Sequence, residues 1–114
     1  MTETWKQIKG YNGQYLVSDQ GNVFSLKSKR QLKPHDVGCR RHYLVVKFWD
    51  KKKKRNVLKY IHRLVCAAFH GPAKGRHCNH LDNDPQNNIA DNLSWVTPSQ
   101  NVRHYWRLRR KGLA

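Results

Sequence analysis

Residues 78–101 have the sequence CNHLDNDPQNNIADNLSWVTPSQN. Within this stretch, 78–81 and 93–96 are short segments whose residues suit β-strands. The segment between them, 82–92, is rich in Asp and Asn and contains a Pro, and these residues favour turns over regular structure. The pattern predicts two short strands that are joined by a polar loop.

A helix is predicted directly after the second strand. Thr97 suits an N-cap, Pro98 suits the first helical position, and Gln100 stands three residues after the cap, where it can complete a capping box. We expect this helix to extend to about residue 110.

Upstream of this unit, the sequence predicts a helix over 62–69, which is mostly apolar and is followed by Gly71 and Pro72. Before the helix, 43–49 and 57–61 are β-prone and predict a central hairpin with a charged tip.

Segments 15–18 and 23–26 are predicted strands, with a turn at 19–22. The resulting fold class is α+β, with an N-terminal accessory module at 1–33 and a domain at 34–114 that holds the central hairpin and the C-terminal strand, strand and helix. Composition favours a purely structural role for the N-terminal hairpin, which would complete the core; handling of substrate is the alternative.

The charge of the chain points to a polyanionic partner. The 114 residues include 23 Lys and Arg against 7 Asp and Glu, a formal net charge of +16. The positive electrostatic field of such a charge attracts nucleic acid and accelerates encounter with it. A membrane is not expected as a partner, because the sequence has neither an apolar run of membrane-spanning length nor an apolar signal segment at the N-terminus. We therefore expect an intracellular protein.

The three cysteines, Cys39, Cys66 and Cys78, do not form a recognisable pattern. Their odd number and the absence of a C-x-x-C pair argue against a disulfide framework. A zinc site made from Cys66, His77 and Cys78 is conceivable, but its spacing matches no common zinc motif, and unligated thiols are favoured.

Three segments together resemble the HNH nucleases, which have a ββα-metal fold, and especially the homing endonucleases of phages. The segments are IHRLVCAAF (61–69), CNHLDNDPQNN (78–88) and NLSWVTPSQNVRH (92–104). The N-terminal segment WKQIKGYNGQYLVSDQGNVFS (5–25) resembles the accessory module that often precedes this nuclease domain. The resemblance covers roughly 5–26 and 60–105, and it implies metal-dependent hydrolysis of DNA phosphodiester bonds.

The resemblance also implies a role for each motif residue. His80 would be the general base, and Asn92 would brace the loop and help to orient it. Asn79 and Asn101 would be the ligands of a divalent ion, Mg²⁺ or alternatively Mn²⁺. These roles suit the residue types, because histidine accepts protons near neutral pH and amide oxygens bind hard cations.

One position departs from the family pattern. Many HNH enzymes have an acidic residue or a histidine before the catalytic histidine, whereas this chain has the neutral Asn79. Two neutral ligands hold a dication weakly, so phosphate of the DNA would have to complete the site. Asp82 could add a negative charge to the site, or it could cap the polar loop, and the sequence leaves both readings open.

Basic residues in three places are expected to contact double-stranded DNA. They are Lys51, Lys52, Lys53, Lys54 and Arg55 at the hairpin tip, Arg63 in the first helix, and Arg103 and Arg107 in the last helix. For Arg63, packing against the core is an equally good interpretation. The implied setting is the cytoplasm of a phage-infected cell, with the protein as a monomer or a homodimer. The alternative function is non-catalytic binding of DNA or RNA on a degenerate nuclease scaffold.

Overall fold

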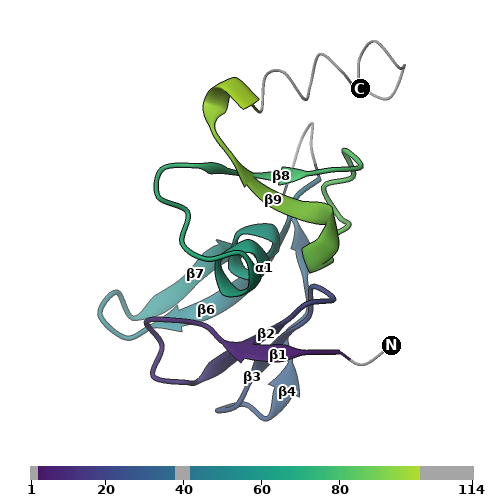
Figure 1. Cartoon of the computed structure of the whole chain (residues 1–114). Coiled ribbons are helices and arrows are strands. Elements are labelled where there is room, and N and C mark those ends of the chain that lie inside the picture. Colours follow the sequence, from purple (N-terminus) through teal and green to yellow (C-terminus); the bar gives the residue numbers. More distant parts are fainter. Residues whose placement is uncertain (1–2, 38–41, 101–114) are drawn as a thin grey trace.

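In the computed structural model, which describes residues 3–37 and 42–100, three small antiparallel sheets surround one α-helix (Figure 1). The elements in chain order are β1 (Trp5–Gln7), β2 (Tyr15–Ser18), β3 (Val23–Ser25), β4 (Arg30–Gln31), β5 (His35–Asp36), β6 (Leu44–Asp50), β7 (Arg55–Tyr60), α1 (Ile61–Phe69), β8 (His77–His80), the 3-10 helix η1 (Ala90–Asn92) and β9 (Leu93–Val96). This arrangement confirms the predicted α+β class.

The N-terminal sheet has the strand order β1-β2-β3-β4, with all neighbours antiparallel. Both predicted strands of this part are present as β2 and β3. The turn between them is fixed by Ser18, whose buried Oγ accepts hydrogen bonds from the N–H groups of Gln20 and Asn22. Gly21 has a φ of 86° in this turn, a conformation that glycine adopts without steric cost.

The second sheet has the order β5-β6-β7, and β6 and β7 form the predicted central hairpin. The turn that joins these strands, 51–54, is folded back by Asp50, whose Oδ1 accepts hydrogen bonds from the N–H groups of Lys52 and Lys53. The same hydrogen bonds hold the pKa of Asp50 below its usual value, that from Lys53 being the largest cause. The strand β5 lies in a segment for which the sequence predicted no strand.

Helix α1 lies between the sheets and packs on β2, β6, β7, β8 and β9 (Figure 1). Its buried residues are Ile61, His62, Val65 and Cys66, which recur at helical spacing and form one face. The helix ends at Phe69, and the C-cap residue His70 donates its N–H to the carbonyl oxygen of Cys66.

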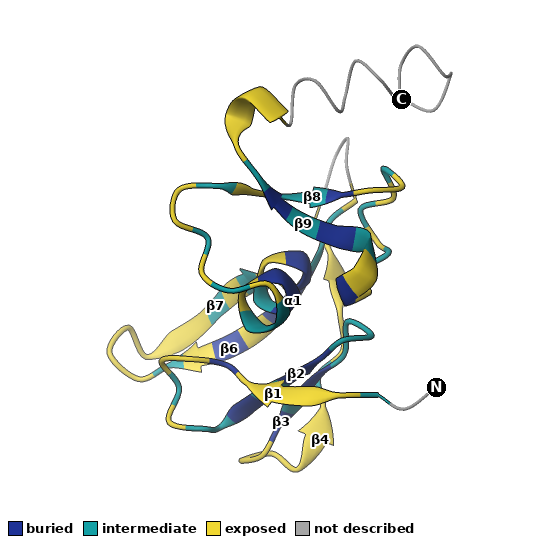
Figure 2. Cartoon of the chain, in the orientation of Figure 1, coloured by how far each residue is buried: buried dark blue, intermediate teal, exposed yellow. Residues whose placement is uncertain are grey.

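A single hydrophobic core joins the N-terminal sheet to the rest of the chain, as the buried residues around α1 in Figure 2 show. Within it, the ring of Tyr15 stacks on that of Phe48, with ring centroids 3.9 Å apart and an interplanar angle of 9°. The core members are Ile8, Tyr15, Val17, Val23, Val46, Phe48, Ile61, Val65, Cys66, Ala90, Leu93 and Trp95.

The thiols of Cys66 and Cys78 are free and lie against each other where α1 meets β8. Their mutual hydrogen bond and burial raise the pKa of the Cys78 thiol. The third cysteine lies outside the described residues. Within the described ranges, no helix is long and apolar enough to cross a membrane.

Candidate active site

The motif residues lie on and around the hairpin of β8 and β9, whose register pairs His77 with Val96 and His80 with Leu93. Beyond His80 the chain leaves the sheet and returns through η1, and the N–H of Leu81 donates to the carbonyl oxygen of Asn92 to close this loop. The sequence-predicted strand, polar loop and strand are thus present.

The predicted helix start after β9 is also confirmed. Residues 98–100 are helical, the N–H of Gln100 donates to Oγ1 of Thr97, and the N–H of Thr97 donates to Oε1 of Gln100. These two hydrogen bonds make the predicted capping box. The remainder of the predicted helix lies outside the described residues.

His80 is the last residue of β8 and is only 7% exposed. Its Nε2 lies 2.8 Å from Oδ1 of Asn88, which is itself buried. Because an amide oxygen can only accept a hydrogen bond, Nε2 carries the proton in this pair. In the neutral imidazole the lone pair is then on Nδ1, so the hydrogen bond favours this tautomer and holds the orientation of the ring.

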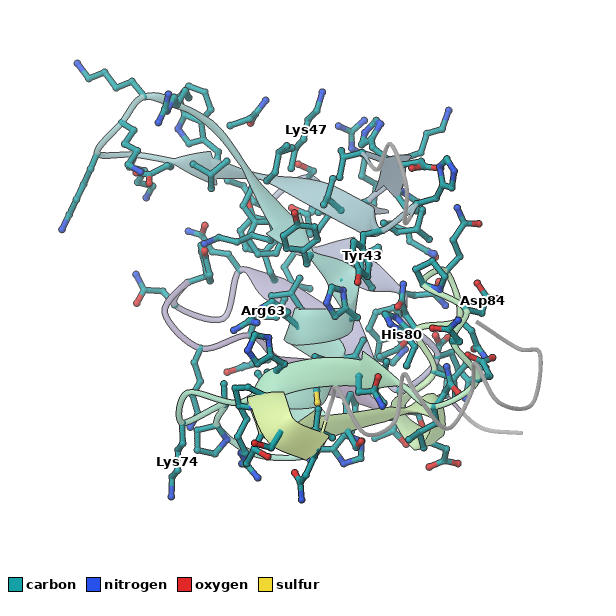
Figure 3. The ribbon with its side chains drawn as sticks, turned by 90° about the horizontal axis from the view of Figure 1, so that it is seen from above. Tyr43, Lys47, Arg63, Lys74, His80 and Asp84 are labelled. Atoms are coloured by element: carbon teal, nitrogen blue, oxygen red, sulfur yellow. The ribbon has the colours of Figure 1, made fainter. Side chains whose placement is uncertain are left out.

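Aromatic rings surround His80 on the side of α1. The ring centroid of His62 is 5.0 Å from that of His80, and the Tyr43 ring is 5.0 Å from His62 and 6.0 Å from His80. Figure 3 shows His80 and Tyr43 as neighbours in this group. Burial, with smaller effects of His80 and Arg63, lowers the pKa of His62 to about 3. His62 is therefore neutral near pH 7 and presents an uncharged ring to His80.

Asn92 binds the two ends of the polar loop together. Its Nδ2 donates to Oδ1 of Asp82 and to the carbonyl oxygen of Asn87, both at 2.9 Å, and its Oδ1 accepts from the N–H of Asp82 at 3.1 Å. Asn87 donates to the other carboxylate oxygen of Asp82. Asp82 thus caps the loop, one of the two roles that the sequence left open for it, and hydrogen bonds from Asn87, Asp84 and Asn92 outweigh its desolvation and lower the pKa of its carboxyl.

Of the two predicted metal ligands, only Asn79 lies in the described part. It precedes His80 on β8, is half-buried, and its carboxamide forms no hydrogen bond with any residue in 3–37 or 42–100. An amide oxygen of this kind is a suitable ligand for a hard divalent cation, so the residue fits the implied metal. Within the same ranges, no group of three or more His, Cys, Asp or Glu side chains is arranged to hold a metal. Asn101 lies outside the described residues.

The predicted DNA-contacting residues of the hairpin tip lie away from His80. The side chains of the basic tip, defined here as Lys51, Lys52, Lys53, Lys54 and Arg55, are exposed. Figures 1 and 3 agree that this tip lies across the molecule from the loop that follows His80.

Arg63 is exposed on α1 (Figure 3), and its guanidinium lies 5.5 Å from the ring centroid of Trp95. This position leaves the side chain accessible while it packs on an aromatic ring. Arg103 and Arg107 lie outside the described residues.

The sequence did not identify two residues that contact His80. Asn88 belongs to a loop with five Asp and Asn side chains between β8 and η1, and nothing in its spacing distinguishes it from its neighbours. In the sequence, His62 was only the first residue of a predicted helix. A contact between 62 and 80 depends on the packing of α1 under β8, which no local pattern encodes.

Comparison with known proteins gives matches over both parts of the chain. Residues 59–103 match the model of an HNH endonuclease family, and residues 3–49 match the NUMOD4 motif. Over 101 residues the chain is 39% identical to the DNA endonuclease I-HmuI of Bacillus phage SP01, an alignment that covers 88% of this chain and 56% of that protein. It is 36% identical over 102 residues to an uncharacterized HNH endonuclease of Acanthamoeba polyphaga mimivirus, with 88% of this chain and 29% of that protein covered.

A solved structure agrees with these matches. The structure describing DNA binding and cleavage by the HNH homing endonuclease I-HmuI superposes with a TM-score of 0.81 at 33% identity, over 97% of this chain and 60% of that one. The chain spans less than two thirds of the length of either of these curated relatives. The chain is a homologue of the phage homing endonuclease I-HmuI, and it carries an HNH endonuclease segment at 59–103 after a NUMOD4 motif at 3–49.

Proposed function

We propose that this chain is a metal-dependent endonuclease that hydrolyses phosphodiester bonds of double-stranded DNA. The observation that carries the proposal is the arrangement of His80, which stands at the end of β8 in an HNH domain with its tautomer fixed by Asn88. The homologue I-HmuI is named as a DNA endonuclease, which supports the same activity here.

In the proposed mechanism, Nδ1 of His80 accepts a proton from the attacking water, since the Nε2 proton is engaged with Asn88. The neutral ring of His62 restricts the motion of His80, and Asn92 keeps the loop after β8 closed through Asp82. Asn79 and Asn101 would hold Mg²⁺, with Mn²⁺ as a substitute. When bound, the ion supplies positive charge that stabilises the scissile phosphate and the leaving oxygen.

DNA is held, in this proposal, by the basic tip, by Arg63 and by Arg103 and Arg107. Beside the tip, an open hollow of about 790 Å³ separates the hairpin from the N-terminal loop, and it is lined by Lys9 and Lys59 as well as by Lys51, Lys52 and Lys53. Since phosphate contacts dominate non-specific affinity for DNA, a row of lysines around a hollow is suited to hold the backbone.

The homology to phage endonucleases supports a setting in the cytoplasm of a phage-infected cell. One candidate active site per chain implies that a monomer nicks one strand, whereas a homodimer could cut both strands.

One observation favours a second candidate function. The neutral Asn79 stands where many HNH enzymes have an acidic residue or a histidine, and weak metal binding would leave a protein that binds DNA or RNA without cutting it. The two functions differ in their products.

The test is incubation with supercoiled plasmid in Mg²⁺, in Mn²⁺ and in EDTA, followed by separation of nicked and linear forms. We expect nicked or linear product with either metal and none in EDTA. Cutting at full rate in EDTA would contradict the metal dependence. Retarded but uncut DNA at all metal concentrations would establish the binding function instead, and a parallel retardation assay with RNA of equal length would identify the preferred nucleic acid.

A further inference from the structure

We propose that the turn at 19–21 in the N-terminal sheet is a positioning element of the candidate active site, acting on His80 through Asn88. The inference rests on the proposed function of His80, and it assigns to the N-terminal module a part in cutting that neither its composition nor its spacing indicates.

The first observation is the contact between the two parts of the chain. The N–H of Ala90 donates to the carbonyl oxygen of Asp19 at 2.8 Å, which ties the start of η1 to the turn between β2 and β3. Two residues after Asp19, Gly21 packs against Asn88, which stands two residues before Ala90. A Cβ on Gly21 would lie 2.9 Å from the Asn88 carbonyl oxygen and 3.1 Å from Cβ of Asn88. This contact, together with the Asp19–Ala90 hydrogen bond, is called the turn seam below.

The second observation is that the turn itself is rigidly held. Ser18 is fully buried, and its Oγ accepts hydrogen bonds from the N–H groups of Gln20 and Asn22 while it donates to a carboxylate oxygen of Glu3. The N–H of Thr4 in turn donates to Oδ1 of Asp19. The turn is therefore a fixed support, and displacement of its backbone would break several hydrogen bonds.

The third observation connects the seam to the chemistry. Asn88 is 5% exposed, and its Oδ1 is the acceptor for Nε2 of His80. The backbone of Asn88 is therefore clamped from the side of the turn, while its side chain sets the tautomer and the angle of His80. A displacement of this backbone by a few tenths of an ångström would be transmitted to the imidazole, and misplacement of a catalytic group by about 1 Å can cost roughly 100-fold in rate.

The test compares two glycines with similar backbone conformations. Gly21 has φ +86° and faces Asn88, whereas Gly75 has φ +78° and a Cβ built on it would meet nothing within 4 Å. Gly21→Ala and Gly75→Ala therefore impose comparable backbone strain, but only the first pushes on Asn88. We expect Gly21→Ala to lower the single-turnover nicking rate roughly 10- to 100-fold at saturating protein with little change in DNA affinity, and Gly75→Ala to stay within about two-fold.

Asn88 itself supplies the rescue experiment. Asn88→Leu removes the acceptor and should lower the rate roughly 10- to 100-fold, as loss of such orienting partners does in metal sites. Asn88→Asp retains an oxygen acceptor at the same place and should recover most of the activity. If Asn88 had only a structural role, the nicking rates of Asn88→Leu and Asn88→Asp would not differ in this way.

A spectroscopic readout separates this inference from the proposed function. In the parent protein, the ¹⁵N shifts of the His80 ring should report a protonated Nε2 and an unprotonated Nδ1, and this signature should change in Gly21→Ala and Asn88→Leu but not in Gly75→Ala. If the parent does not cut DNA, the endonuclease proposal fails while the ring shifts still test the seam.

Equal losses of rate in Gly21→Ala and Gly75→Ala, or unchanged His80 shifts in Gly21→Ala, would overturn the inference. If Gly21→Ala does not fold by circular dichroism, Ala90→Pro tests the same seam from the other side, since it removes the N–H that bonds to Asp19 at the first position of η1, where proline is compatible with the backbone. A parental rate and parental shifts in Ala90→Pro would likewise reject the inference.

Discussion

His80 and Asn101 have different proposed roles, and a metal titration distinguishes them. His80→Ala removes the general base, so nicking should fall about 10²- to 10⁴-fold while DNA binding and folding stay nearly intact. Asn101→Ala should also reduce cutting, but by weakening the hold on the ion, so excess Mn²⁺ should restore part of the rate.

The measurement is the nicking rate of both variants across a series of metal concentrations at fixed pH. Rescue of His80→Ala by metal would contradict its role as base. A parental rate in His80→Ala would remove it as a candidate altogether.

His62 provides a prediction about stability. Its pKa falls from 6.5 to about 3 on folding, so the unfolded chain binds more protons than the folded chain between these values. The stability that the neutral buried ring contributes is therefore fully present above about pH 6.5 and is lost as the pH falls from there toward 3. The expected slope is at most about 1.4 kcal/mol per pH unit within this window.

Urea unfolding of the parent and of His62→Phe between pH 7 and pH 4.5 would measure this slope. The variant should lose most of the pH dependence, whereas His77→Phe, which replaces an exposed histidine, should retain it. Identical pH dependence in the parent and His62→Phe would show that His62 is not held neutral by burial.

At the scale of elements, the basic tip of the β6–β7 hairpin should determine the salt dependence of DNA binding. Each lost phosphate contact flattens the plot of log affinity against log salt by about 0.9, so replacing Lys52 and Lys53 by Ser should change the slope by roughly 2. Replacing the equally exposed Lys27 and Lys33 by Ser removes the same charge from elsewhere and serves as the control. Equal slopes for the two double variants would show that only net charge matters.

The elements that the sequence predicted well are those with one buried face. The strands β2, β6 and β9 have alternating or continuous burial, and α1 carries apolar residues at helical spacing, so their hydrophobic patterns predicted them to within two residues. The strands β1, β4 and β5 were missed because all their side chains are exposed. Such strands form by pairing with the backbone of an adjacent strand, and their side chains carry little information about this pairing.

The candidate site shows the same division. His80 and Asn92 were predicted as site residues because they stand in an ordered motif, and their catalytic roles stay predictions. The structure shows that Asn92 braces the loop through amide hydrogen bonds over a short stretch of chain. The contacts of His80 with Asn88 and His62 could not be predicted from local sequence. They depend on how the loop folds back onto β8 and how α1 packs against it, which are features of the tertiary structure.

At the scale of the molecule, the shared core predicts that the two parts of the chain unfold together. Val17 belongs to the N-terminal sheet, is fully buried and packs in the same cluster as Val65 and Leu93. Val17→Ala should lower the free energy of unfolding by about 2 kcal/mol through lost burial and the cavity it leaves.

In Val17→Ala, hydrogen exchange should become faster in α1 as well as in β2, because both lose stability. Thermal unfolding of the variant should remain a single transition. Faster exchange confined to the N-terminal sheet, with α1 unaffected, would show that the parts are independent. Leu26→Ala, at an exposed position in the same module, is the matched control and should change stability by less than about 0.5 kcal/mol.

The turn seam also limits how genes of this kind can recombine. An N-terminal module taken from another protein would place its own residue at the position of Gly21, which faces Asn88. Any side chain at that position would collide with the Asn88 backbone. Exchange at a boundary near residue 33 would therefore produce functional hybrids mainly when the incoming module carries glycine there, or when the 88–90 segment is transferred with it. Designers of chimeric nucleases should treat these two short segments, 67 residues apart between Gly21 and Asn88, as one inherited unit.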